Sequence, residues 1–232
     1  MRLYVKADEA FEEIKRDLAE MGILVKPKTM QDKNIEGNSD YETKELQNYC
    51  YTILDAKSDE IPGVTQPWAD AEFTERITNP KAVGGYINPG EAYKLRPEVW
   101  NDFLHNGKFG YTYNELIWNN DQFNKIVSRL KEDPESRQLY ISLWDPERDP
   151  DLLGGVSRVP CSLGYNFQVR EGKLNMHYIM RSCDFSTHFA NDVYLAIKLL
   201  EYVAMLTNYE VGSFTHTIFS LHVYRKDVNE VF

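Results

Sequence analysis

Residues 166–181 read NFQVREGKLNMHYIMR, and this stretch contains the clearest structural pattern in the chain. Residues 166–170 and 174–181 alternate between apolar and polar types on either side of Glu171-Gly172. Alternation of this kind is typical of strands with one buried face, and a Gly-containing pair between two such runs is typical of a hairpin turn. The sequence therefore predicts an antiparallel hairpin whose second strand ends at Arg181.

Residues 192–207 are apolar on nearly every side, which predicts a buried central helix. Further helices are predicted over 11–21, 41–55 and 123–130, and further strands over 23–25, 139–144 and 214–224. Because helices and strands mix without a regular βαβ repeat, the expected class is α+β. We expect a mixed twisted sheet that is packed by helices around the long buried helix.

Residues 61–108 are rich in Pro, Gly and aromatic side chains and show weak periodicity. They predict long loops with one helical piece near 96–104. A segment of that length without regular structure is usually functional or an insertion. The length of 232 residues predicts a single domain, 1–232.

The overall charge and the cysteines exclude several classes of protein. A net charge of −10 argues against a nucleic-acid binder, which needs a basic face. Three widely spaced cysteines argue against a disulfide scaffold, and no Cys or His spacing suggests a metal site. The N-terminus has no apolar signal core, and no apolar run is long enough to span a membrane. We expect a cytoplasmic protein without a membrane partner.

Cys161 is the candidate nucleophile, because a thiolate is the strongest nucleophile available at neutral pH. If the hairpin forms, Arg181 lies within reach of Cys161 and would stabilise the thiolate. Arg181 and Ser182 could also hold a phosphate by charge-assisted hydrogen bonds. The alternative for Cys161 is a buried structural cysteine, which is the commoner fate of a lone cysteine. Cys183 and Cys50 are assigned to core packing.

Two acids and a His/Tyr pair complete the candidate groups. Asp184 and Asp192 flank the turn before the buried helix, and Asp192 could either cap that helix or enter a pocket. In a pocket it could bind an amino group or a ring nitrogen. His222 and Tyr224 are two positions apart on one predicted strand, so their side chains face the same way. They could be a structural pair, or they could bind a sugar hydroxyl. Glu45 alone would be a solvated surface acid.

Together these groups resemble the thymidylate synthase superfamily. The resemblance rests on motifs in the order and approximate spacing of that family: Ser136-Arg137, Pro160-Cys161, Arg181-Ser182-Cys183-Asp184, Val211-Gly212 and His222-Val223-Tyr224. It covers residues 137–224 well and the rest of the chain in patches. It implies a thymidylate synthase-like fold, a homodimer formed through the sheet, and 5,10-methylenetetrahydrofolate as the co-substrate.

The resemblance also implies a role for particular residues. Cys161 would attack C6 of a pyrimidine nucleoside monophosphate. The other implied roles are general acid/base for Glu45, removal of the C5 proton for Tyr113, phosphate binding for Arg181, Ser182, Lys28 (or Lys26) and Arg137 of the partner subunit, sugar binding for His222 and Tyr224, and folate binding for Asp184 and Trp68.

One departure from the family pattern points to cytosine. Members that methylate deoxyuridylate carry an asparagine at the pyrimidine-reading position before the buried helix. Here Asn191-Asp192 resembles the pair of phage-type deoxycytidylate hydroxymethylases, with Asp192 at that position. A carboxyl group can accept from the C4 amino group and supply a proton to N3, whereas asparagine cannot act as an acid. Ser162 also replaces a histidine, Gln138 replaces an arginine, and residues 74–108 resemble an insertion.

The expected activity is therefore that of a dCMP 5-hydroxymethylase, with water completing the group added to C5. Only eight residues follow Tyr224, which favours water over hydride as the final acceptor. The alternatives are thymidylate synthesis from dUMP, a CMP hydroxymethylase, a dCMP methyltransferase and a non-catalytic nucleotide-binding regulatory homologue. Ribose and deoxyribose both stay open.

Overall fold

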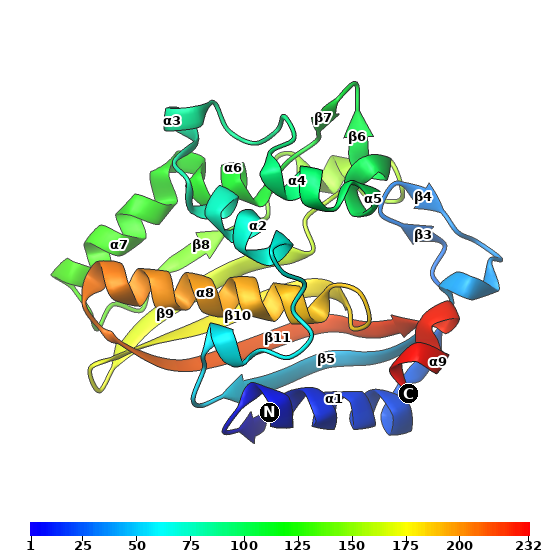
Figure 1. Ribbon diagram of the computed structural model, residues 1–232, viewed down its shortest axis with the longest axis horizontal. Coiled ribbons are helices and arrows are strands. Elements are labelled where there is room, and N and C mark those ends of the chain that lie inside the picture. Colours follow the sequence, from blue (N-terminus) through cyan, green and yellow to red (C-terminus); the bar gives the residue numbers. More distant parts are fainter.

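A seven-stranded mixed sheet forms the centre of the computed structural model, which describes all residues from 1 to 232 (Figure 1). The strands of this sheet are β1 (Arg2–Tyr4), β5 (Thr43–Ile53), β11 (Glu210–Tyr224), β10 (Lys173–Asp184), β9 (Ser162–Arg170) and β8 (Tyr140–Ser142) in spatial order, with β2 (Ile23–Val25) paired to β5. The β1–β5 and β10–β11 pairs are parallel, and the other pairs are antiparallel. Two small hairpins lie outside the sheet: β3 (Thr29–Met30) with β4 (Lys33–Asn34), and β6 (Leu104–His105) with β7 (Lys108–Phe109).

The helices cover one face of this sheet. They are α1 (Ala7–Met21), α2 (Trp68–Ile77), α3 (Pro80–Val83), α4 (Glu91–Leu95), α5 (Pro97–Trp100), α6 (Tyr113–Trp118), α7 (Gln122–Glu132), α8 (Phe189–Thr207) and α9 (Val228–Val231). The rings of Phe11 in α1 and Phe189 in α8 lie 4.7 Å apart, so these two helices share a face. Helices α2 to α7 lie beyond α8 in Figure 1. The mixture of sheet and helices confirms the predicted α+β class.

Helix α8 is the buried central helix that the sequence predicted. It packs on β10 and β11 and is covered by α2 and α7, so 12 of its 19 residues are buried. It begins at Phe189 after His188, and it ends at Asn208, whose φ of 61° lies in the left-handed region that commonly terminates helices. Asp192 therefore lies inside the helix, and its alternative role as the helix cap was wrong.

The predicted hairpin is confirmed by β9 and β10. Glu171 and Gly172 form the turn with φ values of 53° and 76°, as the right-handed twist of paired strands requires. Along β10 the side chains of Met176, Tyr178 and Met180 are fully buried against the helices. The side chains that lie between these along β10 point to the opposite face of the sheet and are only half-buried.

A helix was predicted over 41–55, but residues 43–53 of this stretch form strand β5. Asn48 adopts a left-handed backbone (φ 52°) within the strand. The buried apolar side chains therefore fall on even-numbered Leu46 before Asn48 but on odd-numbered Tyr51 and Ile53 after it. Spacing that is not a strict alternation is easily mistaken for the spacing of a helix. The β-branched and aromatic side chains of 49–53 suit a pleated surface, and β5 pairs with β11 over its whole length.

Residues 61–108 contain more helix than the predicted long loops. The helical piece near 96–104 is confirmed by α5 and a 3₁₀ turn at Asn101–Phe103, but α2 was missed. Trp68, Ala69 and Phe73 are the buried face of α2, which packs on α8. The predicted helices over 11–21 and 123–130 and the predicted strands over 23–25, 139–144 and 214–224 are present. None of the helices has the length and apolar character needed to cross a membrane.

Candidate active site

A cavity of about 490 Å³ is lined by the central strands, by α2 and α8, and by the β3–β4 hairpin. The predicted site residues that line it are Glu45, Trp68, Tyr113, Cys161, Arg181, Ser182, Asp184, Asn191, Asp192, His222 and Tyr224. Two predicted residues, Lys28 and Arg137, do not line it. The fold therefore brings side chains from distant parts of the sequence to a single cavity.

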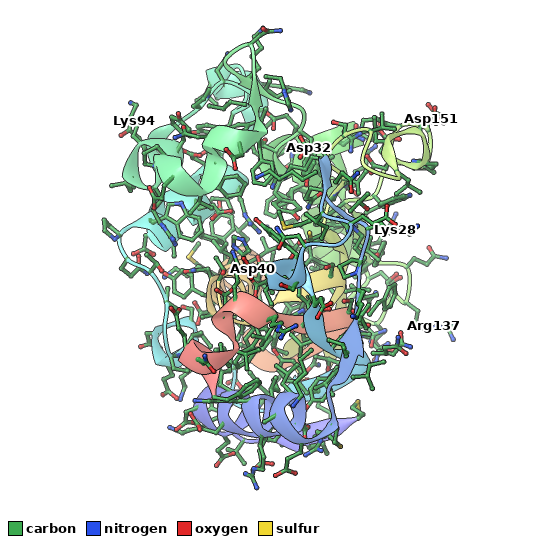
Figure 2. The ribbon with its side chains drawn as sticks, turned by 90° about the vertical axis from the view of Figure 1, so that its right-hand side faces the viewer. Lys28, Asp32, Asp40, Lys94, Arg137 and Asp151 are labelled. Carbon is green, nitrogen blue, oxygen red and sulfur yellow. The ribbon has the colours of Figure 1, made fainter.

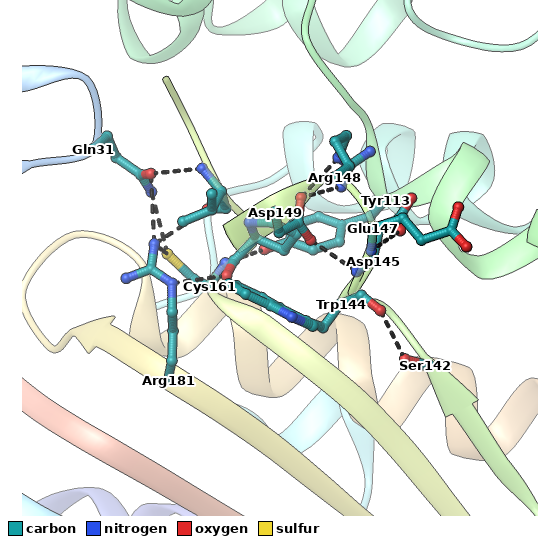
Figure 3. Close-up of polar contacts among 12 residues, drawn as sticks. Gln31, Tyr113, Ser142, Trp144, Asp145, Glu147, Arg148, Asp149, Cys161 and Arg181 are labelled. Atoms are coloured by element: carbon teal, nitrogen blue, oxygen red, sulfur yellow. Dashed lines mark hydrogen bonds and ion pairs between the residues drawn. The ribbon is translucent and has the colours of Figure 1, made fainter. Parts of the chain in front are cut away.

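Cys161 is half-buried in the cavity wall, directly before β9. Its sulfur lies 3.6 Å from Nη2 of Arg181 and 3.4 Å from Nε2 of Gln31 (Figure 3). The hairpin produces this proximity, because the backbone N–H of Arg181 donates to the carbonyl of Cys161 at 2.8 Å. A guanidinium and an amide donor therefore flank the sulfur on the cavity side.

The guanidinium of Arg181 is fixed by the backbone before Cys161. Its Nε donates to the carbonyl of Pro160 at 2.8 Å, and its Nη2 donates to the carbonyl of Val159 at 3.1 Å. A guanidinium has five N–H donors, so this arrangement leaves donors free for an anion in the cavity. Ser182 adds a hydroxyl to the same wall.

Tyr113 contacts the nucleophile segment directly. Its hydroxyl oxygen accepts the backbone N–H groups of Cys161 and Ser162, each at 3.2 Å. Burial raises the pKa of Tyr113, so the phenol stays protonated. Since its oxygen is engaged as an acceptor, its O–H is free to donate into the cavity.

Asp192 lies on the first turns of α8 and extends into the cavity. Burial raises the pKa of its carboxyl to about 6, and nearby His188 and Arg76 partly oppose this shift. Cys183 donates its thiol to Oδ2 of Asp192 at 3.7 Å. Cys183 is buried in the core as predicted, and burial raises its pKa well above the usual range.

Asn191 is turned away from Asp192 toward the loop before α2. Its Oδ1 accepts the backbone N–H of Thr65 at 3.0 Å, and the residue is 4% exposed. One helix position thus anchors the 61–67 segment, while the next presents an acid to the cavity.

A second group of side chains lies along β5 and β11. Glu45 stands opposite His222 in the strand register and accepts a hydrogen bond from Ser220. Glu45 is therefore on a strand, not on the predicted helix. His222 is buried, which lowers its pKa and keeps it neutral, and its ring lies 5.1 Å from that of Tyr224. The neutral side chains of His222 and Tyr224 suit a polar, uncharged ligand group.

The sequence analysis missed Glu72 and Arg76, which α2 brings into the cavity wall. They form a buried pair at 2.6 Å, and the guanidinium of Arg76 lies 4.5 Å from the ring centre of Tyr113. Oε2 of Glu72 is buried without a hydrogen-bond partner. Glu72 and Arg76 are four residues apart, the spacing of an ion pair on a helix, and this was the available signal.

The far wall of the cavity is aromatic. Trp68 is 3% exposed, with the guanidinium of Arg96 4.8 Å from its ring centre. Trp100 and Phe103 also line the cavity, while Asp184 accepts from the backbone N–H of Ser186 at 3.1 Å. Flat apolar walls with a few polar groups suit an aromatic ring system.

Lys28 and Arg137 lie outside the cavity. The Lys28 ammonium pairs with Glu36 at 2.9 Å, and its side chain is 77% exposed, so the prediction that it reaches the site was wrong. Lys26 is likewise paired elsewhere, with Glu42 at 2.8 Å. Lys33, at the start of β4, lines the cavity instead. Arg137 is exposed at the periphery of the molecule (Figure 2). No cluster of His, Cys, Asp or Glu side chains suits a metal ion.

Comparison with known proteins identifies the family. The family model described as Thymidylate synthase matches residues 91–232. A Methanosarcina barkeri protein named "Putative thymidylate synthase" is 28% identical over 221 residues, covering 91% of this chain and 94% of that protein. The Thymidylate synthase of Oenococcus oeni is 29% identical over 160 residues, which is 61% of this chain and 48% of that protein.

Other relatives are matched over part of their length only. The Methanosarcina acetivorans protein, also named "Putative thymidylate synthase", is 36% identical over 123 residues, and the chain spans about half of that relative (55%). Among solved structures, thermostable thymidylate synthase A from Bacillus subtilis superimposes with a TM-score of 0.74 at 19% identity, covering 97% of this chain and 82% of that one. This likeness confirms the predicted fold.

Proposed function

Because the chain belongs to the thymidylate synthase family, we propose that it transfers a one-carbon unit from methylenetetrahydrofolate to C5 of a cytidine monophosphate. Members of this family are one-carbon transferases that use methylenetetrahydrofolate as a co-substrate. The proposed products are 5-hydroxymethyl-dCMP and tetrahydrofolate. The observation that carries the choice of cytosine is the half-buried acid Asp192, which lines the same cavity as Cys161 and Arg181 and whose pKa is raised to about 6.

The proposed reaction begins with the Cys161 thiolate, which forms a bond to C6 and makes C5 nucleophilic. Methylenetetrahydrofolate supplies the one-carbon unit at C5. Loss of the C5 proton and release of tetrahydrofolate leave an exocyclic methylene, to which water adds to form the hydroxymethyl group. The Cys161 thiolate is then expelled from C6, which restores the cytosine ring and frees the enzyme. The O–H of Tyr113, fixed 3.2 Å from the backbone nitrogen of Cys161, orders the polar groups around C5.

Asp192 reads the base in this proposal. A cytosine ring presents a C4 amino group and an unprotonated N3, and negative charge builds on the ring as the sulfur adds. A carboxyl group with a pKa near 6 can accept from the amino group and transfer its proton to N3 near neutral pH. The neutral amide of an asparagine has no such proton to transfer.

Glu72 is a better general acid/base than the predicted Glu45. Glu72 lies on α2 beside Arg76 and raises the pKa of Asp192, so the two acids share one electrostatic environment. Glu45 is engaged with Ser220 and lies opposite His222, at the part of the cavity that we assign to the sugar. We therefore place the proton transfers to and from the ring on Glu72.

The phosphate, sugar and folate subsites follow from the remaining contacts. Arg181 and Ser182 would bind the phosphate with their free donors, and His222 and Tyr224 would bind the sugar hydroxyl. The aromatic wall of Trp68, Trp100 and Phe103, with Asp184 nearby, fits the flat ring of a reduced folate. These placements are supported by the charge and shape of each wall.

We further propose that the protein is a homodimer that pairs through the open face of the sheet. Half-buried side chains alternate along β10 on that face, and Phe219 of β11 is 45% exposed there. Such a dimer would let Arg137 of the partner subunit reach the phosphate, which explains why this residue lies outside its own cavity.

Thymidylate synthesis from dUMP is the second candidate, and the names of the relatives favour it. A carboxylate at position 192 could accept from N3–H of uracil. Mass spectrometry of products formed from each pyrimidine monophosphate with methylenetetrahydrofolate separates the two. Added CH₂O on dCMP supports the proposal, whereas conversion of dUMP alone to the methylated product overturns it. A protein that binds nucleotide without turnover would be a regulatory homologue.

A further inference from the structure

Gln31 is a cavity residue that the proposed chemistry leaves without a role. It lies at the tip of the β3–β4 hairpin, about 130 positions before the nucleophile in the sequence. Its side chain enters the cavity and contacts three parts of the nucleophile segment: the backbone of Val159, the sulfur of Cys161 and the guanidinium of Arg181 (Figure 3). It is the nearest donor to the sulfur.

The orientation of this amide is determined by its partners. Oε1 accepts from the backbone N–H of Val159 at 3.3 Å and from Nη2 of Arg181 at 3.5 Å. Both of those groups can only donate, so the oxygen must face them. Nε2 therefore faces Sγ of Cys161, at 3.4 Å.

The hairpin presents Gln31 in an uncommon backbone conformation. Its φ of 56° lies in the left-handed region, where residues other than Gly and Asn are rare. Two side-chain contacts hold the hairpin tip against residues 102–105: Asp32 lies 3.6 Å from His105, and Lys33 forms an ion pair with Asp102 at 2.5 Å. A strained residue that is held from both sides and directed at the sulfur suggests a function rather than a neutral turn.

The other charged or titratable groups around the sulfur do not replace this contact. The cavity wall carries Arg158, Arg181, Asp192, Cys183 and the phenols of Tyr113 and Tyr224, while Tyr111 lies behind. Its other charged or titratable side chains are those of Lys33, Tyr41, Glu45, Glu72, Arg76, Asp102, Asp184, His188, His222 and Lys226. Among them only Arg181 donates to Sγ, and its Nη2 is shared with Val159 and Gln31. The Gln31 amide is thus one of two donors to the sulfur.

We propose that Gln31 is a positioning residue for the nucleophile: its amide N–H donates to the Cys161 sulfur, favours the thiolate, and fixes the Arg181 guanidinium beside it. This inference rests on the proposed role of Cys161 as the nucleophile, but not on which pyrimidine is converted. The hairpin that carries Gln31 is fastened to residues 102–105, so this part of the 74–108 segment supports the site.

The test is the pH dependence of Cys161 alkylation by iodoacetamide, followed by peptide mass spectrometry without substrate or folate. Glycine suits the backbone of position 31, so Gln31→Gly removes the amide without adding strain. The pH midpoint of the alkylation rate should rise by about half a pH unit to one pH unit. At a pH below the midpoint, alkylation should therefore be roughly three- to tenfold slower than in the wild-type protein. Gln31→Glu, of the same size, should move it further because it replaces a donor with a negative charge.

Midpoints in both variants that equal the wild-type midpoint would overturn the inference. The plateau rate at high pH reports access to the sulfur, so it separates an opened cavity from a lost donor. Glu36→Gln, an exposed change beyond the hairpin, should leave the midpoint unchanged. If wild-type protein converts no pyrimidine nucleotide, the proposed function fails, yet the midpoints still decide the role of Gln31.

Discussion

Replacing Asp192 by Asn should make the protein more stable and less active on cytidylate. Folding raises the pKa of this carboxyl from 3.8 to about 6, mainly through burial. A shift of that size corresponds to about 3 kcal/mol at 1.36 kcal/mol per unit. Because the folded state holds the proton more tightly than the unfolded state, stability is highest below the unfolded pKa and is lost as the pH rises through 6.

Above pH 6 the ionised carboxylate in the cavity therefore destabilises the fold, and the neutral amide introduced by Asp192→Asn would not. At pH 8 the variant should melt about 6–12 °C higher as an upper bound, at roughly 2–4 °C per kcal/mol for a chain of this size. The difference should shrink toward pH 4, where wild-type Asp192 is increasingly protonated in both states. Differential scanning calorimetry across this pH range measures it.

The same change removes the proposed acid. Loss of a general acid typically costs about 10²–10⁴ in rate, so kcat/KM for dCMP should fall within that range, while dUMP should lose much less. Two results would refute the reasoning. One is a variant that keeps full turnover of dCMP. The other is a melting temperature that is unchanged at pH 8, which would mean that the carboxyl is not buried in solution.

Four other variants test the remaining assignments. Cys161→Ser should abolish turnover while calorimetry still detects nucleotide binding, and residual turnover would exclude Cys161 as the nucleophile. Glu72→Gln should lower kcat by about 10²-fold or more, and Glu45→Gln by less, so the reverse ranking would return the acid/base role to Glu45. Arg137→Ala should raise KM for the nucleotide, and mixing it with Cys161→Ser should restore activity if the arginine acts across a dimer. In wild-type protein, turnover of dCMP should fall about tenfold per pH unit above 6, since Asp192 must be protonated.

The fold could be predicted where one periodicity dominates. Helix α8 lies between the sheet and helices α2 and α7, and the β9–β10 hairpin has one face against the core, so each shows one clear periodicity. Strand β5 was mistaken for a helix because Asn48 breaks its alternation. Helix α2 was missed because it is only ten residues long and follows a Pro/Gly-rich stretch.

The candidate site could be predicted as far as local spacing determines it. Arg181 follows Cys161 by one hairpin, so the sequence placed them together, and the structure has them 3.6 Å apart. Gln31 and Glu72 were missed because their positions depend on how a hairpin and a short helix pack against distant strands. Lys28 was misplaced for the same reason, since it lies just before that hairpin and its side chain is exposed and paired with Glu36.

In the proposed reaction, Cys161 and Asp192 together activate a cytosine ring for one-carbon transfer. To test this, the protein is incubated with methylenetetrahydrofolate and equal amounts of dCMP and dUMP in ¹⁸O-labelled water. The masses of the products are then measured by mass spectrometry. We expect dCMP to gain a CH₂O unit that contains ¹⁸O, while dUMP stays unchanged. Methylation of dUMP with dCMP left intact would contradict it.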